Sequence, residues 1–202
     1  MESISLLDAS ALIGLIAAVV LTLNSLLGML LSSAYKQIPW WKQSPNWLKR
    51  LSLLDLHNWT AYIALLLVCL HPVLLVVDKT SKFTWIDVLF PIHAPHQKIL
   101  VALGTITFYA VITVIITTQK VVKRKMGFRL WKNIHLISYG TALLFVIHGI
   151  FMDPELKDRP IDYLDGEKLV AEICGLVLLI ASVLRYRLYI KKKKQLNLVA
   201  KI

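Results

Sequence analysis

The sequence has few charged residues and is especially poor in acidic ones. Charged residues make up 17% of the 202 residues, and only 12 Asp and Glu stand against 23 Lys and Arg, which gives a formal net charge of +11. Hydrophobic residues make up 57% of the chain, and the mean hydropathy is +0.65. Several apolar runs reach the roughly 20 residues that a helix needs to cross a bilayer. We therefore expect an integral membrane protein in contact with lipid.

Cysteine is also scarce, and two common sequence signals are missing. Cys69 and Cys174 both lie inside apolar segments, which excludes a framework of several disulfides. The N-terminus has neither the basic segment nor the small-residue cleavage site of a signal peptide, so we expect the first apolar run to be retained as a helix. The chain has no glycine-rich dinucleotide fingerprint after a strand, so we do not expect it to oxidise NAD(P)H itself.

Five apolar segments are candidates for membrane spans, at about residues 11–32, 51–77, 99–118, 133–152 and 169–190. None of them alternates in the way that barrel strands do, and only helices or closed barrels satisfy their backbone groups within lipid. We therefore expect an all-α fold, a single membrane domain over residues 1–202 built as a bundle of five transmembrane helices. The connections are too short to hold a separate soluble domain.

The basic residues lie on alternate connections. Residues 34–50, 119–132 and 185–202 together contain seventeen of the 23 Lys and Arg. The positive-inside rule then places the N-terminus outside and the C-terminus inside, in what we expect to be a bacterial inner membrane. Because these clusters separate apolar runs, they indicate membrane topology and not binding of nucleic acid.

Four of the six histidines lie in two of the predicted spans. His57 and His71 are 14 residues apart in the second span, and His135 and His148 are 13 apart in the fourth, which corresponds to roughly 20 Å of helix rise. Both spans enter from the cytoplasmic side, so His57 and His135 share an inner level while His71 and His148 share an outer level. Ionisable groups inside a membrane are rare and usually mark a functional site.

Two imidazoles at each of two levels point to haem iron. Zinc normally takes four ligands, and no cysteine or acidic residue lies at these levels. Haem needs only two axial ligands, because the porphyrin supplies four equatorial nitrogens. We therefore predict two haem b groups and electron transfer across the bilayer. A haem-free transporter or channel, whose histidines carry protons or bind a metal, is the alternative, and a structural anchor for a partner is a third possibility.

Helix periodicity raises one difficulty for this arrangement. A step of 14 residues returns to within roughly 40° of the same helix face, whereas a step of 13 residues lands roughly 140° away. The fourth span must therefore bend, shift its register or present its two histidines from different flanks. Gly140 and Gly149 are places where it could kink or pack closely.

Two segments resemble a known family. "LHNWTAYIALLLVCLHP" and "LWKNIHLISYGTALLFVIHG" are similar to the haem-carrying helices of the ferric reductase-like transmembrane superfamily, which includes NADPH oxidases, yeast-type ferric reductases and MsrQ-type haem subunits. The stretch "TTQKVVKRKMGFRLWKNIH" is similar to the basic loop before a haem helix of that family. The resemblance covers roughly residues 48–187. It implies that His57 and His135 are the axial ligands of an inner haem, and His71 and His148 those of an outer one.

The expected partners follow from electron transfer. The donor would be a cytoplasmic flavoprotein, a bound flavin or a membrane quinol. The acceptor would lie outside, as ferric iron, oxygen, a quinone or a periplasmic reductase. Arg124 and Arg129 are candidates for the propionates of the inner haem, because guanidinium matches carboxylate geometry. The chain would thus be the electron-transfer subunit of an oxidoreductase, with no residue assigned to catalysis. For His93 and His96, in a proline-containing outer loop, metal binding, contact with the outer haem and an ordinary loop role all stay open.

Overall fold

The computed structural model describes residues 5–33, 35–37, 39–157, 160 and 162–199, and within these ranges it contains helices and no strands. Five long helices make up the bundle: α1 (Leu6–Leu31), α4 (Leu53–Val77), α6 (Lys98–Thr118), α8 (Phe128–Phe151) and α9 (Gly166–Val199). All five are long and apolar enough to cross a membrane. The predicted all-α membrane bundle is therefore confirmed, and the protein is a multi-pass integral membrane protein.

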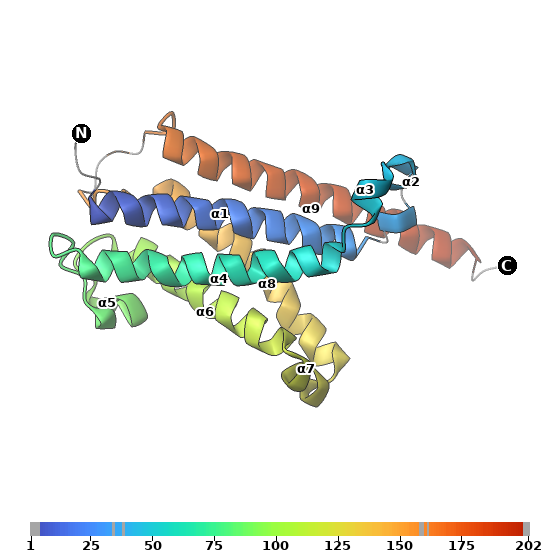
Figure 1. Cartoon of the computed structure of the whole chain (residues 1–202), viewed down its shortest axis with the longest axis horizontal. Coiled ribbons are helices and arrows are strands. Elements are labelled where there is room, and N and C mark those ends of the chain that lie inside the picture. The colour runs from blue at the N-terminus through green and yellow to red at the C-terminus, as the bar shows by residue number, and fades with distance from the viewer. Residues whose placement is uncertain (1–4, 34, 38, 158–159, 161, 200–202) are drawn as a thin grey trace.

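Short helices form the connections at both ends of the bundle. They are η1 (Tyr35–Gln37), α2 (Pro39–Gln43), α3 (Asn46–Lys49), α5 (Trp85–Leu89), η2 (Pro91–His93) and α7 (Lys120–Met126). Figure 1 shows α2, α3 and α7 at the opposite end of the bundle from α5. The three basic connections therefore share one end, as the charge pattern predicts. Which side of the membrane this end faces stays a prediction.

The helix ends differ from the predicted spans by a few residues for local reasons. α1 begins five residues early because Ser5 and Asp8 form a capping box, in which each side chain accepts a hydrogen bond from the other residue's backbone N–H. α8 begins at Phe128, directly after Gly127, whose φ of 77° ends the preceding helix α7. The last helix continues to Val199, beyond its apolar part.

The helices divide into two packed groups. α1 packs most extensively on α4 and also contacts α8 and α9, while α6 packs on α8. In Figure 1, α6 and α8 run obliquely to α1 and α4 and separate from them toward α7. A buried cluster of Ala17, Ala18, Val68 and Phe145 fills the middle, where α1, α4 and α8 meet. α8 thus crosses α4 at an angle, which determines how the histidines of these two helices can meet.

The outer surface of the bundle is suited to lipid. Large apolar side chains such as Leu66, Leu143 and Ile99 are 59%, 61% and 78% exposed. Contiguous apolar exposure of this extent is unfavourable in water and is expected of a lipid-facing surface. The few buried polar side chains inside the bundle then become informative, because each must find a partner without water.

Candidate functional site

The four intramembrane histidines form two facing pairs. The ring centroids of His57 on α4 and His135 on α8 lie 6.2 Å apart with an interplanar angle of 74°. The rings of His71 on α4 and His148 on α8 lie 6.3 Å apart at 82°. α8 is continuous from Phe128 to Phe151, and its oblique course across α4 allows both of its histidines to face that helix. The 13-residue step is therefore accommodated without interrupting α8.

The spacing within each pair matches a metal ion between two imidazoles. Two metal–nitrogen bonds of about 2 Å each, with roughly 1 Å from each nitrogen to its ring centre, give about 6 Å between ring centres. A direct hydrogen bond between two ring nitrogens, at about 3 Å, would instead give about 5 Å. Both observed separations correspond to the first case.

In three of the four histidines, a hydrogen bond to Nδ1 determines which ring nitrogen keeps its lone pair. Nδ1 of His57 lies 3.1 Å from the carbonyl oxygen of Asn24, and Nδ1 of His71 lies 2.8 Å from that of Ser10. Nδ1 of His148 lies 2.8 Å from the carbonyl oxygen of Leu100. A carbonyl only accepts, so each Nδ1 carries the proton and each Nε2 keeps its lone pair. This is the tautomer that a metal-ligating histidine adopts.

α1 supports both α4 histidines through a repeated arrangement. Ser10 Oγ donates to the carbonyl of His71 at 2.8 Å, and Asn24 Nδ2 donates to the carbonyl of His57 at 2.6 Å. A glycine follows four residues after each of these polar residues, at Gly14 and Gly28. A Cβ on Gly14 would lie 3.0 Å from the His71 ring, and a Cβ on Gly28 would lie 3.2 Å from the His57 ring. The two glycines therefore let the imidazoles lie directly against the α1 backbone.

α6 supports His148 in the same way. The Leu100 carbonyl accepts from Nδ1, and a Cβ on Gly104 would lie 3.0 Å from Cε1 of the ring. His135 has a different environment. Its ring stacks on Trp131 with centroids 5.3 Å apart and planes at 23°, and Lys123 Nζ lies 3.7 Å from the Trp131 ring. Within the described residues, His135 Nδ1 is buried and has no hydrogen-bond partner.

A partly open cavity adjoins the pair formed by His71 and His148. Its walls come from α1, α4, α8 and α9, and most of the lining side chains are apolar, such as Leu7, Leu15 and Leu75. His71 and His148 lie in this wall. An apolar cavity with two imidazoles in its wall suits a porphyrin, whose macrocycle is apolar and whose iron takes two axial nitrogens. The donor set of the outer pair therefore fits haem.

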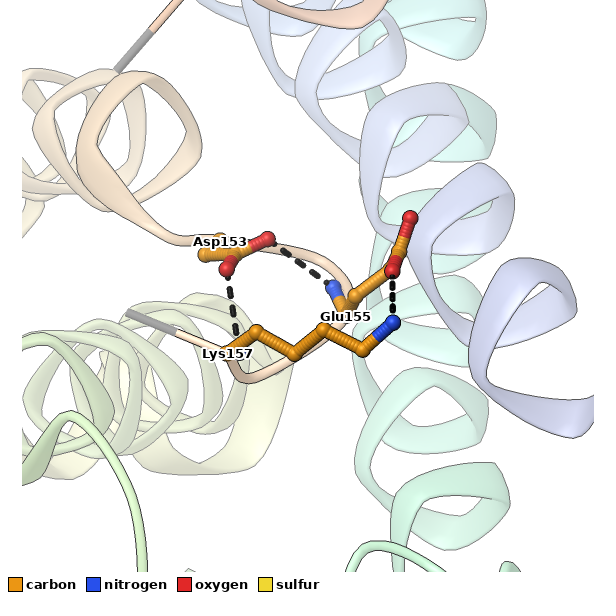
Figure 2. Close-up of polar contacts among 3 residues, drawn as sticks. All are labelled: Asp153, Glu155 and Lys157. Carbon is orange, nitrogen blue, oxygen red and sulfur yellow. Dashed lines mark hydrogen bonds and ion pairs between the residues drawn. The ribbon is translucent and has the colours of Figure 1, made fainter. Parts of the chain in front are cut away.

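A folded loop borders the cavity at the end of α8. Figure 2 shows the Asp153 carboxylate accepting hydrogen bonds from the backbone N–H groups of Glu155 and Lys157, at 3.1 and 3.0 Å. Lys157 Nζ also pairs with the Glu155 carboxylate at 2.6 Å. Lys168 of α9 donates to the carbonyls of Gly149 and Met152 and so joins α9 to this turn. These contacts fix the end of α8 that carries His148.

The other candidate residues lie away from the pairs. Arg124 and Arg129 are exposed on α7 and at the start of α8, so no contact with the inner pair supports their predicted role, which stays a prediction. His93 is exposed, and His96 lies 6.4 Å from Phe83 between ring centroids. Among the described residues, no three His, Cys, Asp or Glu side chains gather as a metal site.

Sequence reasoning missed the supporting residues of α1 and α6. Ser10 with Gly14 and Asn24 with Gly28 repeat a polar residue and a glycine at the same 14-residue interval that separates His57 from His71. α1 runs antiparallel to α4, so this shared 14-residue interval is the signal from which the supporting residues could have been found. Leu100 contributes only a backbone carbonyl, and no side-chain pattern could have identified it.

Replacing Asn24 by leucine is expected to loosen the contact between α1 and α4. The Asn24 amide donates to the His57 carbonyl and, at 2.8 Å, to Thr60 Oγ1. Hydrogen bonds between membrane helices contribute about 1 kcal/mol, so we expect the free energy of unfolding to fall by about that amount. Unfolding of the purified protein in detergent measures the change. Asn133→Leu, at an exposed position of α8, is the matched control, and an equal loss in both variants would contradict the assigned contact.

Comparison with known proteins identifies one family. The family model described as "Ferric reductase like transmembrane component" matches residues 11–146, which is more than half of the chain. The match includes His57, His71 and His135 and ends just before His148. Comparisons with curated proteins and with solved structures found no match.

Proposed function

Because this chain belongs to the family of ferric reductase-like transmembrane components, we propose that it is a di-haem b protein that carries electrons across the bilayer. His57 and His135 would hold one haem, and His71 and His148 the other. Bound haem supplies reversible one-electron exchange at its iron. The observation that carries the proposal is the arrangement of four rings as two pairs with equal separations, 6.2 and 6.3 Å.

The residues around the histidines orient the axial nitrogens. The Asn24, Ser10 and Leu100 carbonyls hold three rings in the tautomer that leaves the Nε2 lone pair free for a metal ion. A hydrogen bond from Nδ1–H to a carbonyl also increases the basicity of the opposite nitrogen. Both effects favour axial ligation and would tune the affinity of each pair for iron.

The residues between the two pairs keep the middle of the bundle dry. Ala17, Ala18, Val68 and Phe145 form a buried apolar cluster there. The two histidines of α4 are 14 residues apart, or roughly 20 Å along the helix. The small alanines permit close approach of α1, and the cluster excludes the water that would let protons or ions leak along the same path.

The donor and the acceptor would meet opposite ends of the bundle. We propose that α7 faces the cytoplasm of a bacterial inner membrane, where its exposed Arg124 and Lys125 would attract an acidic flavoprotein or the phosphate of a flavin. A membrane quinol is the other candidate donor. An acceptor at the outer end, where the cavity beside His71 and His148 lies, would be ferric iron, oxygen, a quinone or a periplasmic reductase.

Reconstitution tests the proposed transfer. We expect liposomes that enclose a reductant and contain the protein to reduce ferricyanide added outside, whereas protein-free liposomes do not. His93→Ala, an exposed histidine outside the pairs, should leave the rate unchanged. Equal reduction with and without the protein would contradict transmembrane electron transfer. A colourless protein that instead carries protons or metal ions would support a haem-free transporter.

A further inference from the structure

Polar groups of Trp131, His135 and Lys123 lie together at the His57–His135 pair. Trp131 Nε1 and His135 Nδ1 are both buried and have no hydrogen-bond partner within the described residues. Their rings are stacked, with centroids 5.3 Å apart. Lys123 of α7 places its ammonium 3.7 Å from the centroid of the Trp131 ring. α7 and the beginning of α8 lie together at one end of the bundle (Figure 1).

This group contrasts with the surroundings of the other three histidines. His57, His71 and His148 each donate from Nδ1 to a backbone carbonyl. A buried donor without an acceptor costs roughly 1–3 kcal/mol, and the Trp131 N–H is such a donor. The indole N–H can only donate, and the ammonium carries a positive charge. A carboxylate has two acceptor oxygens and a negative charge, so it can accept from the indole N–H and pair with the ammonium.

We propose that Trp131 and Lys123 bind a carboxylate, and that this carboxylate is a propionate of the haem held between His57 and His135. The proposal rests on the proposed function and deepens it. The Trp131 N–H is buried, so an acidic side chain of a docked partner protein could not reach it from solution. Trp131 lies about one helical turn before His135 on α8, so it is close to the ring that would hold the haem. Arg124 and Arg129 are exposed and are left for partners in solution.

Trp131→Phe tests the indole donor, because it removes the N–H group and keeps an aromatic ring against His135. We expect the affinity of one of the two haems to fall about tenfold, since a hydrogen bond to a charged group is lost. The measurement is the rate at which haem passes to an excess of apomyoglobin, resolved into its two phases. Trp47→Phe is the matched control, because Trp47 is 66% exposed on α3.

Lys123→Met tests the charge. Without the ammonium, the negative propionate beside the iron is less compensated, so we expect one of the two midpoint potentials to become more negative. Lys120→Met on the same short helix is exposed and serves as the control. A potentiometric titration of the absorption spectrum resolves the two haems and does not depend on turnover.

Haem dimethyl ester identifies the source of the carboxylate. In the wild-type protein, we expect the ester to bind at its weaker site about as loosely as ordinary haem binds to the affected site of Trp131→Phe. Combining the ester with Trp131→Phe should cause no further loss of affinity, because both changes remove the same hydrogen bond. If Trp131→Phe weakens binding of the ester as much as binding of ordinary haem, or weakens neither, the propionate assignment is overturned. A wild-type protein that binds no haem at all would contradict the proposed function instead.

Discussion

Replacing His71 by alanine is expected to remove one haem and leave the other, so that the haem content falls from two per chain to one. His71 faces His148 with ring centroids 6.3 Å apart, and Ser10 and Gly14 of α1 hold it in place. Without this ring, one axial position has no nitrogen donor. His57 and His135, one half of α4 away, keep their geometry because the Asn24 contacts with α4 are unchanged.

The same variant should lose electron transfer across the membrane and keep reduction from the side of the remaining haem. A single haem spans only part of the roughly 30 Å hydrocarbon core. Haem content is measured from the pyridine haemochrome spectrum, and transfer is measured with liposomes that enclose the reductant. His93→Ala is the matched control, since that histidine is exposed in the outer loop. Retention of two haems in His71→Ala would contradict the assigned pairing.

Gly14→Leu is expected to have nearly as large an effect although every histidine is retained. A Cβ at this position would already lie 3.0 Å from both Cε1 and Nδ1 of His71, and Gly14 also lines the cavity beside the outer pair. The leucine must therefore displace the ring and occupy space in the cavity. Overpacking of this kind costs about 1–3 kcal/mol, which corresponds to a loss of roughly 5-fold to 150-fold in affinity for the outer haem.

Gly140 provides the control for this experiment. It lies within α8, and a Cβ there would meet nothing within 4 Å. Gly140→Leu should therefore bind both haems normally, although it carries the same added side chain on a membrane helix. If Gly14→Leu and Gly140→Leu behave alike, the close contact between α1 and His71 does not determine haem binding.

The sequence was sufficient to predict the bundle and the pairing of the histidines by depth. Long apolar runs indicate spans directly, and alternate basic connections place His57 with His135 and His71 with His148 at common levels. It did not identify the helix that supports them. The side chains of Ser10 and Asn24 donate to the α4 backbone, and their carbonyls lie against the histidine rings. Both contacts depend on how α1 packs against α4.

The electrostatic assignments were harder to predict for a related reason. Arg124, Arg129 and Lys123 are equivalent as sequence signals, because all three are basic residues shortly before His135. Only the fold shows that Lys123 lies over Trp131 while the two arginines are exposed, since α7 and the turn at Gly127 set the direction of each side chain. Side-chain direction in a short connection depends on these backbone angles and not on residue type.

Haem quantification on the purified wild-type protein, expressed with sufficient haem supply, tests the central claim most directly. Two facing imidazole pairs with equal ring separations predict two haem b groups per chain, both low-spin, in the reduced-minus-oxidised spectrum. A protein without haem b absorption, or with haem that remains after all four histidines are replaced, would contradict it.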